Sequence, residues 1–230
     1  CRFGGFSRTE CVYPSILEDD LKVQDDVIQQ LRKVEQDPQK ALEHLSNLVK
    51  HFDDKGKWTW IQDIGRQGVA IAQGLDSQSG EGLFLSWWGL ACIMQKRGSR
   101  EDGVALCRKG LELGIQANDL YSQGMAHHFI GIGLGNKLAQ FVEATTHLHK
   151  AVICFEAIDD KEEVAAVYFS TAWVMRNFGD YDQAMHFVCR ALDIASPGGN
   201  DRNDTFRGTC IAFKADLENL AGQIEKAEEC

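Results

Sequence analysis

The fold follows from one short stretch, Gly179-Asp180-Tyr181-Asp182-Gln183-Ala184, together with Ala191-Leu192, which begins seven residues after Ala184. A glycine at a turn readily adopts the left-handed conformation that ends a helix, and the aspartate after it can cap the next helix. Ala184 and Ala191 are small and two helical turns apart, so they fall on one face of that second helix. The stretch predicts two helices that are joined by a tight turn and packed closely together.

Similar stretches recur along the chain at regular distances. The small residues that open the second helices are Gly103, Ala144, Ala184 and Ala227, at spacings of 41, 40 and 43 residues. A period near 40 with two helices per unit is typical of a helical solenoid. A bulky side chain at these positions would overpack the helix contact, at a cost of about 1–3 kcal/mol. The predicted small packing residues are Gly103, Gly110, Ala144, Ala151, Ala184, Ala191 and Ala227.

Helical periodicity continues through the rest of the chain. Leu45, Leu48, Val49 and Phe52, for example, recur at steps of three and four residues, as on the buried face of a helix. Sustained alternation of apolar and polar residues, which is typical of strands, is missing from the sequence. Polar turns interrupt the pattern every 18 to 22 residues. We therefore expect an all-α chain of antiparallel neighbouring helices.

The unit around Gly179 resembles the tetratricopeptide repeat (TPR) family. The helix before Gly179 supports the resemblance, because Tyr168, Thr171, Ala172 and Met175 stand where the family has its bulky–Leu–Gly–Tyr set. TPR units usually have 34 residues, whereas units near 40 resemble those of bacterial signalling and regulatory proteins and of some scaffolds. The resemblance implies a right-handed α-solenoid of antiparallel helix pairs, a TPR-like superhelix. An earlier helix with the same pattern contains Trp87, Leu90, Ala91 and Met94.

The repeats suggest a single solenoid over residues 15–230, preceded by an N-terminal extension, 1–14, that we expect to be poorly ordered. Gly222 in the last unit is expected to begin a second helix that the end of the sequence cuts short. We therefore expect the natural protein to continue beyond Cys230. The expected units are a leading helix at 15–35, a weak repeat at 38–75, repeats at 80–117, 119–158 and 160–196, and a partial repeat at 202–230.

In TPR proteins the first helix of each pair lines a concave groove, and the resemblance implies the same role here. Aromatic side chains in such a groove can stack on a peptide or on a small ligand. The alternative is that these side chains pack between adjacent repeats. The candidate groove residues are Trp88, Gln95, Lys96, Phe129, Asn136, Phe169, Trp173, Arg176 and Asn177.

Other motifs lack the spacing that chemistry requires. His127-His128 and His147-x-His149 are too close in sequence for either pair to share a helix face, so neither chelates a metal alone. The glycines at 131–135 lack both the GxGxxG spacing and a Walker Lys-Ser/Thr. His186 and Cys189 are within nucleophile–base reach on a helix, but no orienting acid accompanies them. We expect no catalytic residue, metal or cofactor.

Composition limits the partners. The chain has 34 Asp and Glu against 24 Lys and Arg, a net charge of −10, which opposes binding of a nucleic-acid backbone to this surface. The longest apolar stretch, 83–94, is too short to cross a membrane. None of the eight cysteines forms a CxxC pair, and those among apolar residues fit a reducing, cytoplasmic compartment. Cys1 is compatible with a trimmed segment or with a lipoprotein N-terminus.

Together these observations predict a non-catalytic binding and regulatory (sensor) module for a protein, a peptide or a small molecule. By family resemblance, the expected parent is a bacterial signalling protein with an output domain after residue 230, such as a diguanylate cyclase. The alternative is a self-contained scaffold that bridges partner proteins and forms a homodimer through its terminal repeat.

Overall fold

The structure is a computed structural model that describes residues 37–95, 99–135, 140–195 and 201–228. Within these ranges the regular elements are nine α-helices, and the predicted all-α class is confirmed. The extension 1–14 and the leading helix 15–35 lie outside the described residues. The helices are α2 (Pro38–Asp54), α3 (Trp58–Gly74), α4 (Gln78–Met94), α5 (Arg100–Gln116), α6 (Leu120–Leu134), α7 (Phe141–Ala157), α8 (Lys161–Phe178), α9 (Tyr181–Ile194) and α10 (Asp201–Glu228).

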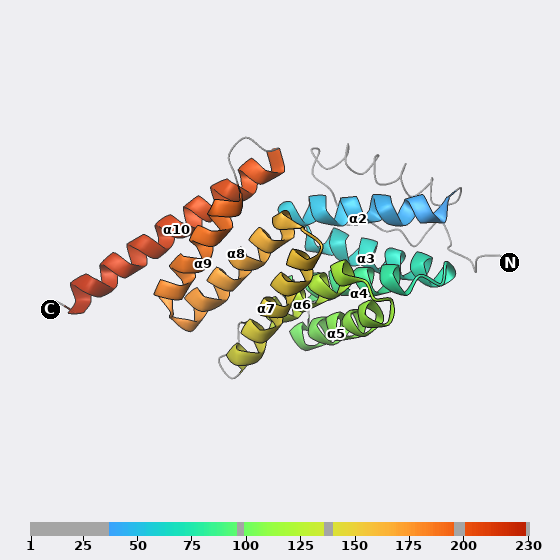
Figure 1. Ribbon diagram of the computed structural model, residues 1–230, viewed down its shortest axis with the longest axis horizontal. Coiled ribbons are helices and arrows are strands. Elements are labelled where there is room, and N and C mark those ends of the chain that lie inside the picture. The colour runs from blue at the N-terminus through green and yellow to red at the C-terminus, as the bar shows by residue number, and fades with distance from the viewer. Residues whose placement is uncertain (1–36, 96–98, 136–139, 196–200, 229–230) are drawn as a thin grey trace.

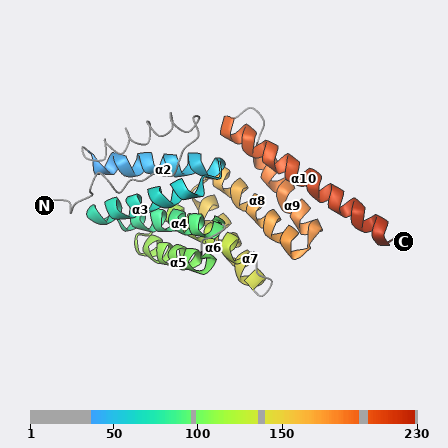
Figure 2. The ribbon, with the colours of Figure 1, turned by 180° about the vertical axis from the view of Figure 1, so that it is seen from behind.

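Each helix packs on the next one in the chain, which makes a solenoid of antiparallel pairs. Helices α2 to α5 stack at one end and α10 lies at the other, as Figures 1 and 2 show from opposite sides. We call α2, α4, α6 and α8 the first helices, and α3, α5, α7 and α9 the second helices. Among the described residues, no helix is both long and apolar enough to cross a membrane.

A side-chain cap begins each first helix. Asp37, Ser77, Asp119 and Asp160 accept hydrogen bonds from backbone N–H groups two or three residues further on. Such caps satisfy N–H groups that have no partner inside the helix. The residue before each of the last three caps has a positive φ, between 50° and 56°, so these three turns share one geometry. The cap therefore sets where each first helix starts.

The turn at Gly179 has the conformation that the sequence predicts. Gly179 ends α8 in the left-handed region with φ 93°, and the side chain of Asp180 accepts a hydrogen bond from the backbone N–H of Gln183. On α9, Ala184 and Ala191 are fully buried. The pair α8–α9 is thus joined and packed through the residues that carry the repeat.

The closest helix contact joins α4 to α5 through glycines on both sides. A Cβ atom placed on Gly103 would lie 2.6 Å from the carbonyl oxygen of Gly89, and one on Gly110 would lie 2.5 Å from that of Gly82. Between these two points the buried Cys107 thiol donates a hydrogen bond to the Ser86 carbonyl at 3.5 Å. At Gly103 and Gly110 the two backbones approach so closely that even a methyl group would clash with a backbone carbonyl. On α7, the small residues Ala144 and Ala151 are also fully buried.

The last element differs from the expected partial repeat. Helix α10 runs without a break from Asp201 to Glu228, so the expected turn at Gly222 is wrong and Ala227 belongs to this helix. A glycine inside a helix costs only about 1 kcal/mol relative to alanine, and Glu225, Lys226 and Ala227 are good helix formers. Helix α10 packs on α9, and its Cys210, Phe213 and Leu217 are buried.

Replacing Gly103 by Ala should lower the free energy of unfolding by about 1–3 kcal/mol, because the new methyl group overpacks the α4–α5 contact. The matched control is Gly208→Ala on α10, where a Cβ atom meets nothing within 4 Å. That control should gain up to about 1 kcal/mol from helix propensity. Urea unfolding of the two variants measures the difference, and equal stability would contradict the close contact.

Candidate functional site

A cavity of about 430 Å³ opens between the first helices. Its wall is formed mainly by α4, α6, α8 and α10, with contributions from the end of α2 and the start of α3. We call it the aromatic cavity, because six aromatic rings line it. These rings belong to Trp58, Trp87, Phe129, Phe169, Trp173 and Phe206.

The wall uses the same face of three first helices, α4, α6 and α8. Residues ten positions after the caps Ser77, Asp119 and Asp160 line the cavity, and so do residues thirteen positions after them. Positions that are three residues apart share a helix face, so the caps determine which side chains reach the cavity. The first set is Trp87, Phe129 and Ser170, and the second is Leu90, Ile132 and Trp173.

The rings pack against one another across neighbouring units. Trp87 and Phe129 have ring centroids 4.8 Å apart, and Phe169 lies edge-on to Phe206 at 5.8 Å. Phe129 is 2% exposed and yet lines the cavity. It therefore packs on a ring of the neighbouring unit and also forms part of the cavity wall.

Three of the predicted groove residues, Phe129, Phe169 and Trp173, line the aromatic cavity. Trp88 does not, because its Cβ packs on Gly65 and its ring lies 5.0 Å from the Arg66 guanidinium, on the α3 side. Trp88 thus lies outside the aromatic cavity.

Polar groove candidates also lie away from the cavity. The Gln95 amide donates hydrogen bonds to the Gln62 side chain at 2.8 Å and to the Trp58 carbonyl at 3.4 Å. Arg176 lies 5.5 Å from the Phe213 ring. The cavity wall does not include Asn177, and Lys96 and Asn136 fall outside the described residues.

Trp88 lies one residue beyond the position that faces the cavity, Trp87. Trp88, Phe129 and Phe169 are 41 and 40 residues apart, which follows the spacing of the second helices. The caps Ser77, Asp119 and Asp160 are 42 and 41 residues apart. One residue turns a side chain by about 100° on a helix. Counting from the caps would have found wall residues that were missed, namely Trp87, Ser170, Leu90 and Ile132.

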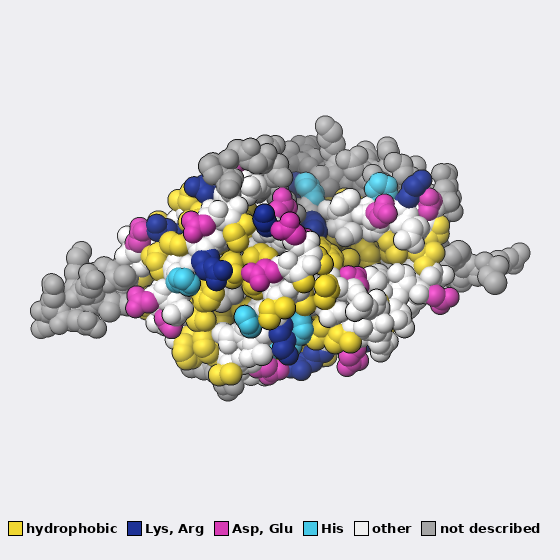
Figure 3. All heavy atoms as spheres, in the orientation of Figure 1, with side chains coloured by type: hydrophobic (Ala, Val, Ile, Leu, Met, Phe, Trp, Pro, Cys, Tyr) yellow, Lys and Arg dark blue, Asp and Glu magenta, His cyan; other side chains and the backbone are white. Residues whose placement is uncertain are grey.

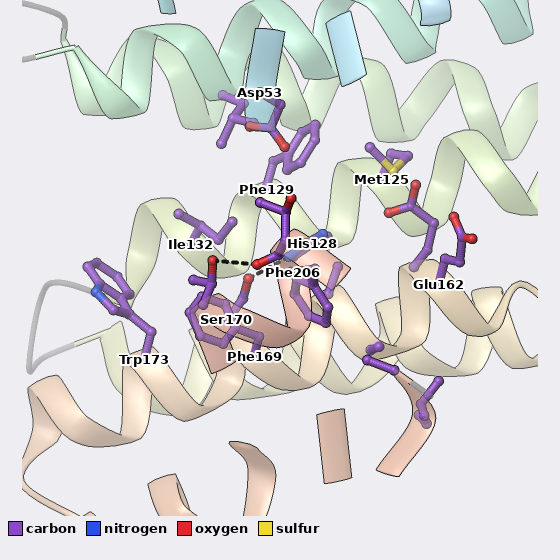
Figure 4. A pocket seen from close by; sticks show the side chains of 18 of the residues that line it. Asp53, Met125, His128, Phe129, Ile132, Glu162, Phe169, Ser170, Trp173 and Phe206 are labelled. Atoms are coloured by element: carbon purple, nitrogen blue, oxygen red, sulfur yellow. Dashed lines mark hydrogen bonds between the residues drawn. The ribbon is translucent and has the colours of Figure 1, made fainter. Parts of the chain in front are cut away.

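A histidine and a serine join α6 to α8 at the cavity. The His128 Nε2 and Ser170 Oγ atoms are 2.8 Å apart, and Figure 4 shows both side chains at the cavity wall. Burial lowers the pKa of His128 to about 4, so the ring is neutral at pH 7. Its Nδ1 atom is buried and has no hydrogen-bond partner among the described residues. In hydrolytic Ser–His pairs a carboxylate accepts a hydrogen bond from this nitrogen, and His128 has no such partner among the described residues. A histidine with a pKa of about 4 is also a weak base, so the His128–Ser170 pair differs from a hydrolytic one in both respects.

Charged groups gather where α2 meets the start of α8. The Lys50 ammonium lies 3.0 Å from the buried Glu163 carboxylate and 5.1 Å from the centre of the Tyr121 ring. The Tyr121 hydroxyl donates a hydrogen bond to the same carboxylate at 3.3 Å. This cluster ties the first unit to the fourth and places Asp53 and Glu162 in the wall nearby.

Two histidines meet between α6 and α7. The Nδ1 atoms of His127 and His147 are 2.8 Å apart. Burial and, secondarily, the charge of His147 lower the pKa of His127 to about 4. No three His, Cys, Asp or Glu side chains in the described ranges form a possible metal site. In this geometry the Nδ1–H of one neutral ring donates a hydrogen bond to the Nδ1 lone pair of the other.

Comparison with known proteins supports the fold of the chain and nothing further. No family model matches the chain, and no curated protein matches it. Among solved structures, the chain is similar to BtubC (BKLC) from P. vanneervenii, with 19% sequence identity and a TM-score of 0.63. The match covers 94% of this chain and 89% of that one. At this identity the likeness supports the helical architecture.

Acid should destabilise the protein through its buried histidines. The pKa of His128 is about 4 when folded and about 6.5 when unfolded, so the unfolded chain binds more protons between these values. The contribution of neutral His128 to the free energy of unfolding should therefore be fully present above about pH 7.5 and should decrease as the pH falls toward 4. For His128 alone we expect a loss of about 1–2 kcal/mol at pH 5 relative to pH 7.

Urea unfolding at both pH values measures this loss. The variant His128→Gln should show a smaller difference between pH 7 and pH 5 than the wild type. The control His149→Gln, at an exposed position of α7, should keep the wild-type difference. An unchanged difference in His128→Gln would contradict the assigned burial.

Proposed function

We propose that this chain is a non-catalytic binding and regulatory module whose aromatic cavity holds a ligand. The observation that carries the proposal is the convergence of six aromatic rings on one cavity of about 430 Å³. Ligand pockets commonly measure about 300–1,000 Å³ and combine apolar walls with a few placed polar groups. The cavity has that composition, with His128 and Ser170 as polar groups among the rings.

A regulatory role is supported by the way α6 and α8 are joined. Helix α6 packs extensively on α4 but meets α8 at few points, and two of the contacts are the hydrogen bonds His128–Ser170 and Tyr121–Glu163. A ligand between these helices would alter their spacing, and α9 and α10 follow directly from α8. We propose that a signalling output, such as a diguanylate cyclase in a cytoplasmic protein, is the kind of element that such a change would control.

A scaffold role is the second candidate, and a different surface favours it. Val142 and Ile153 on α7 are 76% and 52% exposed, and Ile115 on α5 is 58% exposed. Figure 3 shows apolar side chains among charged ones on one face of the molecule. In a scaffold, these exposed apolar groups on the second helices would be the contact points for a partner protein, away from the cavity.

The variant Trp173→Ala tests the cavity as the binding site. Compounds and peptides that raise the melting temperature of the wild type should lose most of that effect in Trp173→Ala, because the indole ring that lines one end of the cavity is removed. The matched control is Trp88→Ala, a tryptophan on the same layer of helices that lies outside the wall. A thermal-shift screen measures both variants.

Compounds that bind wild type and Trp88→Ala equally, but Trp173→Ala weakly, support the proposal. If they shift Trp173→Ala as much as the wild type, the cavity is not the binding site, and the scaffold alternative gains.

A further inference from the structure

We infer that the aromatic cavity binds a small organic cation, an amine or quaternary ammonium compound with an apolar body. This inference rests on the proposed function, because it names the class of ligand for the same cavity. It goes beyond that proposal by assigning the ligand's charge and the direction in which it lies.

The cavity is elongated and its two ends differ. One face of α8 lines it over about three turns, from Glu162 through Ala166 and Phe169 to Trp173. Figure 4 shows Glu162 and Trp173 at opposite ends, with Asp53 approaching from α2. A bound molecule would therefore place its polar group near Glu162 and its apolar body beside Trp173.

The polar end has an excess of negative charge. Three carboxylates, on Asp53, Glu162 and Glu163, line the cavity together with one ammonium group, that of Lys161. The Lys161 ammonium lies 3.8 Å from the Asp159 carboxylate, and both of these side chains are exposed. Lys50 is held by Glu163 and by the Tyr121 ring. With Lys50 counted, three carboxylates stand against two ammonium groups, and the remaining negative charge attracts a cation and repels an anion.

The rest of the wall also suits a cation. Aromatic faces attract ammonium groups through the ring quadrupole, more strongly where water is excluded. Among the described residues, four rings already hold a Lys or Arg of the chain, on Tyr121, Trp88, Phe213 and Tyr168. None of these four belongs to the six rings of the aromatic cavity.

One buried polar group adds an independent observation. His128 is 6% exposed, lines the cavity and has no partner for its Nδ1 atom among the described residues. When its Nε2–H donates to Ser170, Nδ1 presents a lone pair. In this tautomer an ammonium N–H of a ligand can donate to that lone pair, whereas in the other tautomer Nδ1–H is itself a donor.

Three ligands of matched shape test the inference: 1-naphthylmethylammonium, 1-naphthylmethanol and 1-naphthoate, which carry positive, zero and negative charge. Dissociation constants are measured by NMR titration at low ionic strength, where charge effects are largest. We expect the cation to bind about fivefold more tightly than the alcohol, and the anion most weakly.

Two variants separate charge from shape. Ala166→Phe fills the cavity from α8 and should weaken binding of the cation and the alcohol by about tenfold. Glu162→Gln should reduce the advantage of the cation to about twofold and leave the alcohol unchanged. The control Ala212→Phe, at an exposed position of α10, should bind all three ligands as the wild type does, and circular dichroism checks that each variant is folded.

The outcomes distinguish the inference from the proposed function. If the alcohol binds as tightly as the cation and Ala166→Phe weakens both, the cavity binds ligands but has no preference for cations, and the inference is overturned. If a folded Ala166→Phe binds all three ligands as the wild type does, the cavity is not the site and both proposals fail.

Discussion

The hydrogen bonds that begin the first helices determine the rest of the structure. Ser77, Asp119 and Asp160 each cap a helix that follows a residue with positive φ, so all three helices start in the same way. Because a helix turns by about 100° per residue, a fixed start means that residues at equal distances from the caps point in the same direction. Trp87 and Phe129 meet across two units for this reason, and Trp173 faces the same cavity.

The cavity exists because the solenoid does not pack evenly. Glycines bring α4 and α5 into backbone contact, and α6 packs closely on α4. Helix α8 instead meets α6 at few points, through the His128–Ser170 and Tyr121–Glu163 hydrogen bonds among others. These two hydrogen bonds join the helices where their apolar packing is sparse. The space that remains is lined by rings and has carboxylates at one end.

The sequence predicted the all-α solenoid and the turn at Gly179, because small residues, glycines and caps act locally and recur in each unit. It did not predict which face of each first helix points into the cavity, since Trp87 and Trp88 are both large aromatics and only the cap distinguishes them. The expected turn at Gly222 failed because one glycine does not end a helix by itself. The pairing of His128 with Ser170 joins two units, which periodicity within one unit does not reveal.

The central claim is that a ligand enters the aromatic cavity. The chain has five tryptophans, of which Trp58, Trp87 and Trp173 line the cavity, whereas Trp60 and Trp88 do not. The most direct test is ¹⁹F NMR of protein labelled with 5-fluorotryptophan, titrated with 1-naphthylmethylammonium and assigned by single Trp→Phe variants. The account predicts shifts of the Trp58, Trp87 and Trp173 resonances, with Trp60 and Trp88 unchanged. Shifts confined to Trp60 and Trp88 would contradict it.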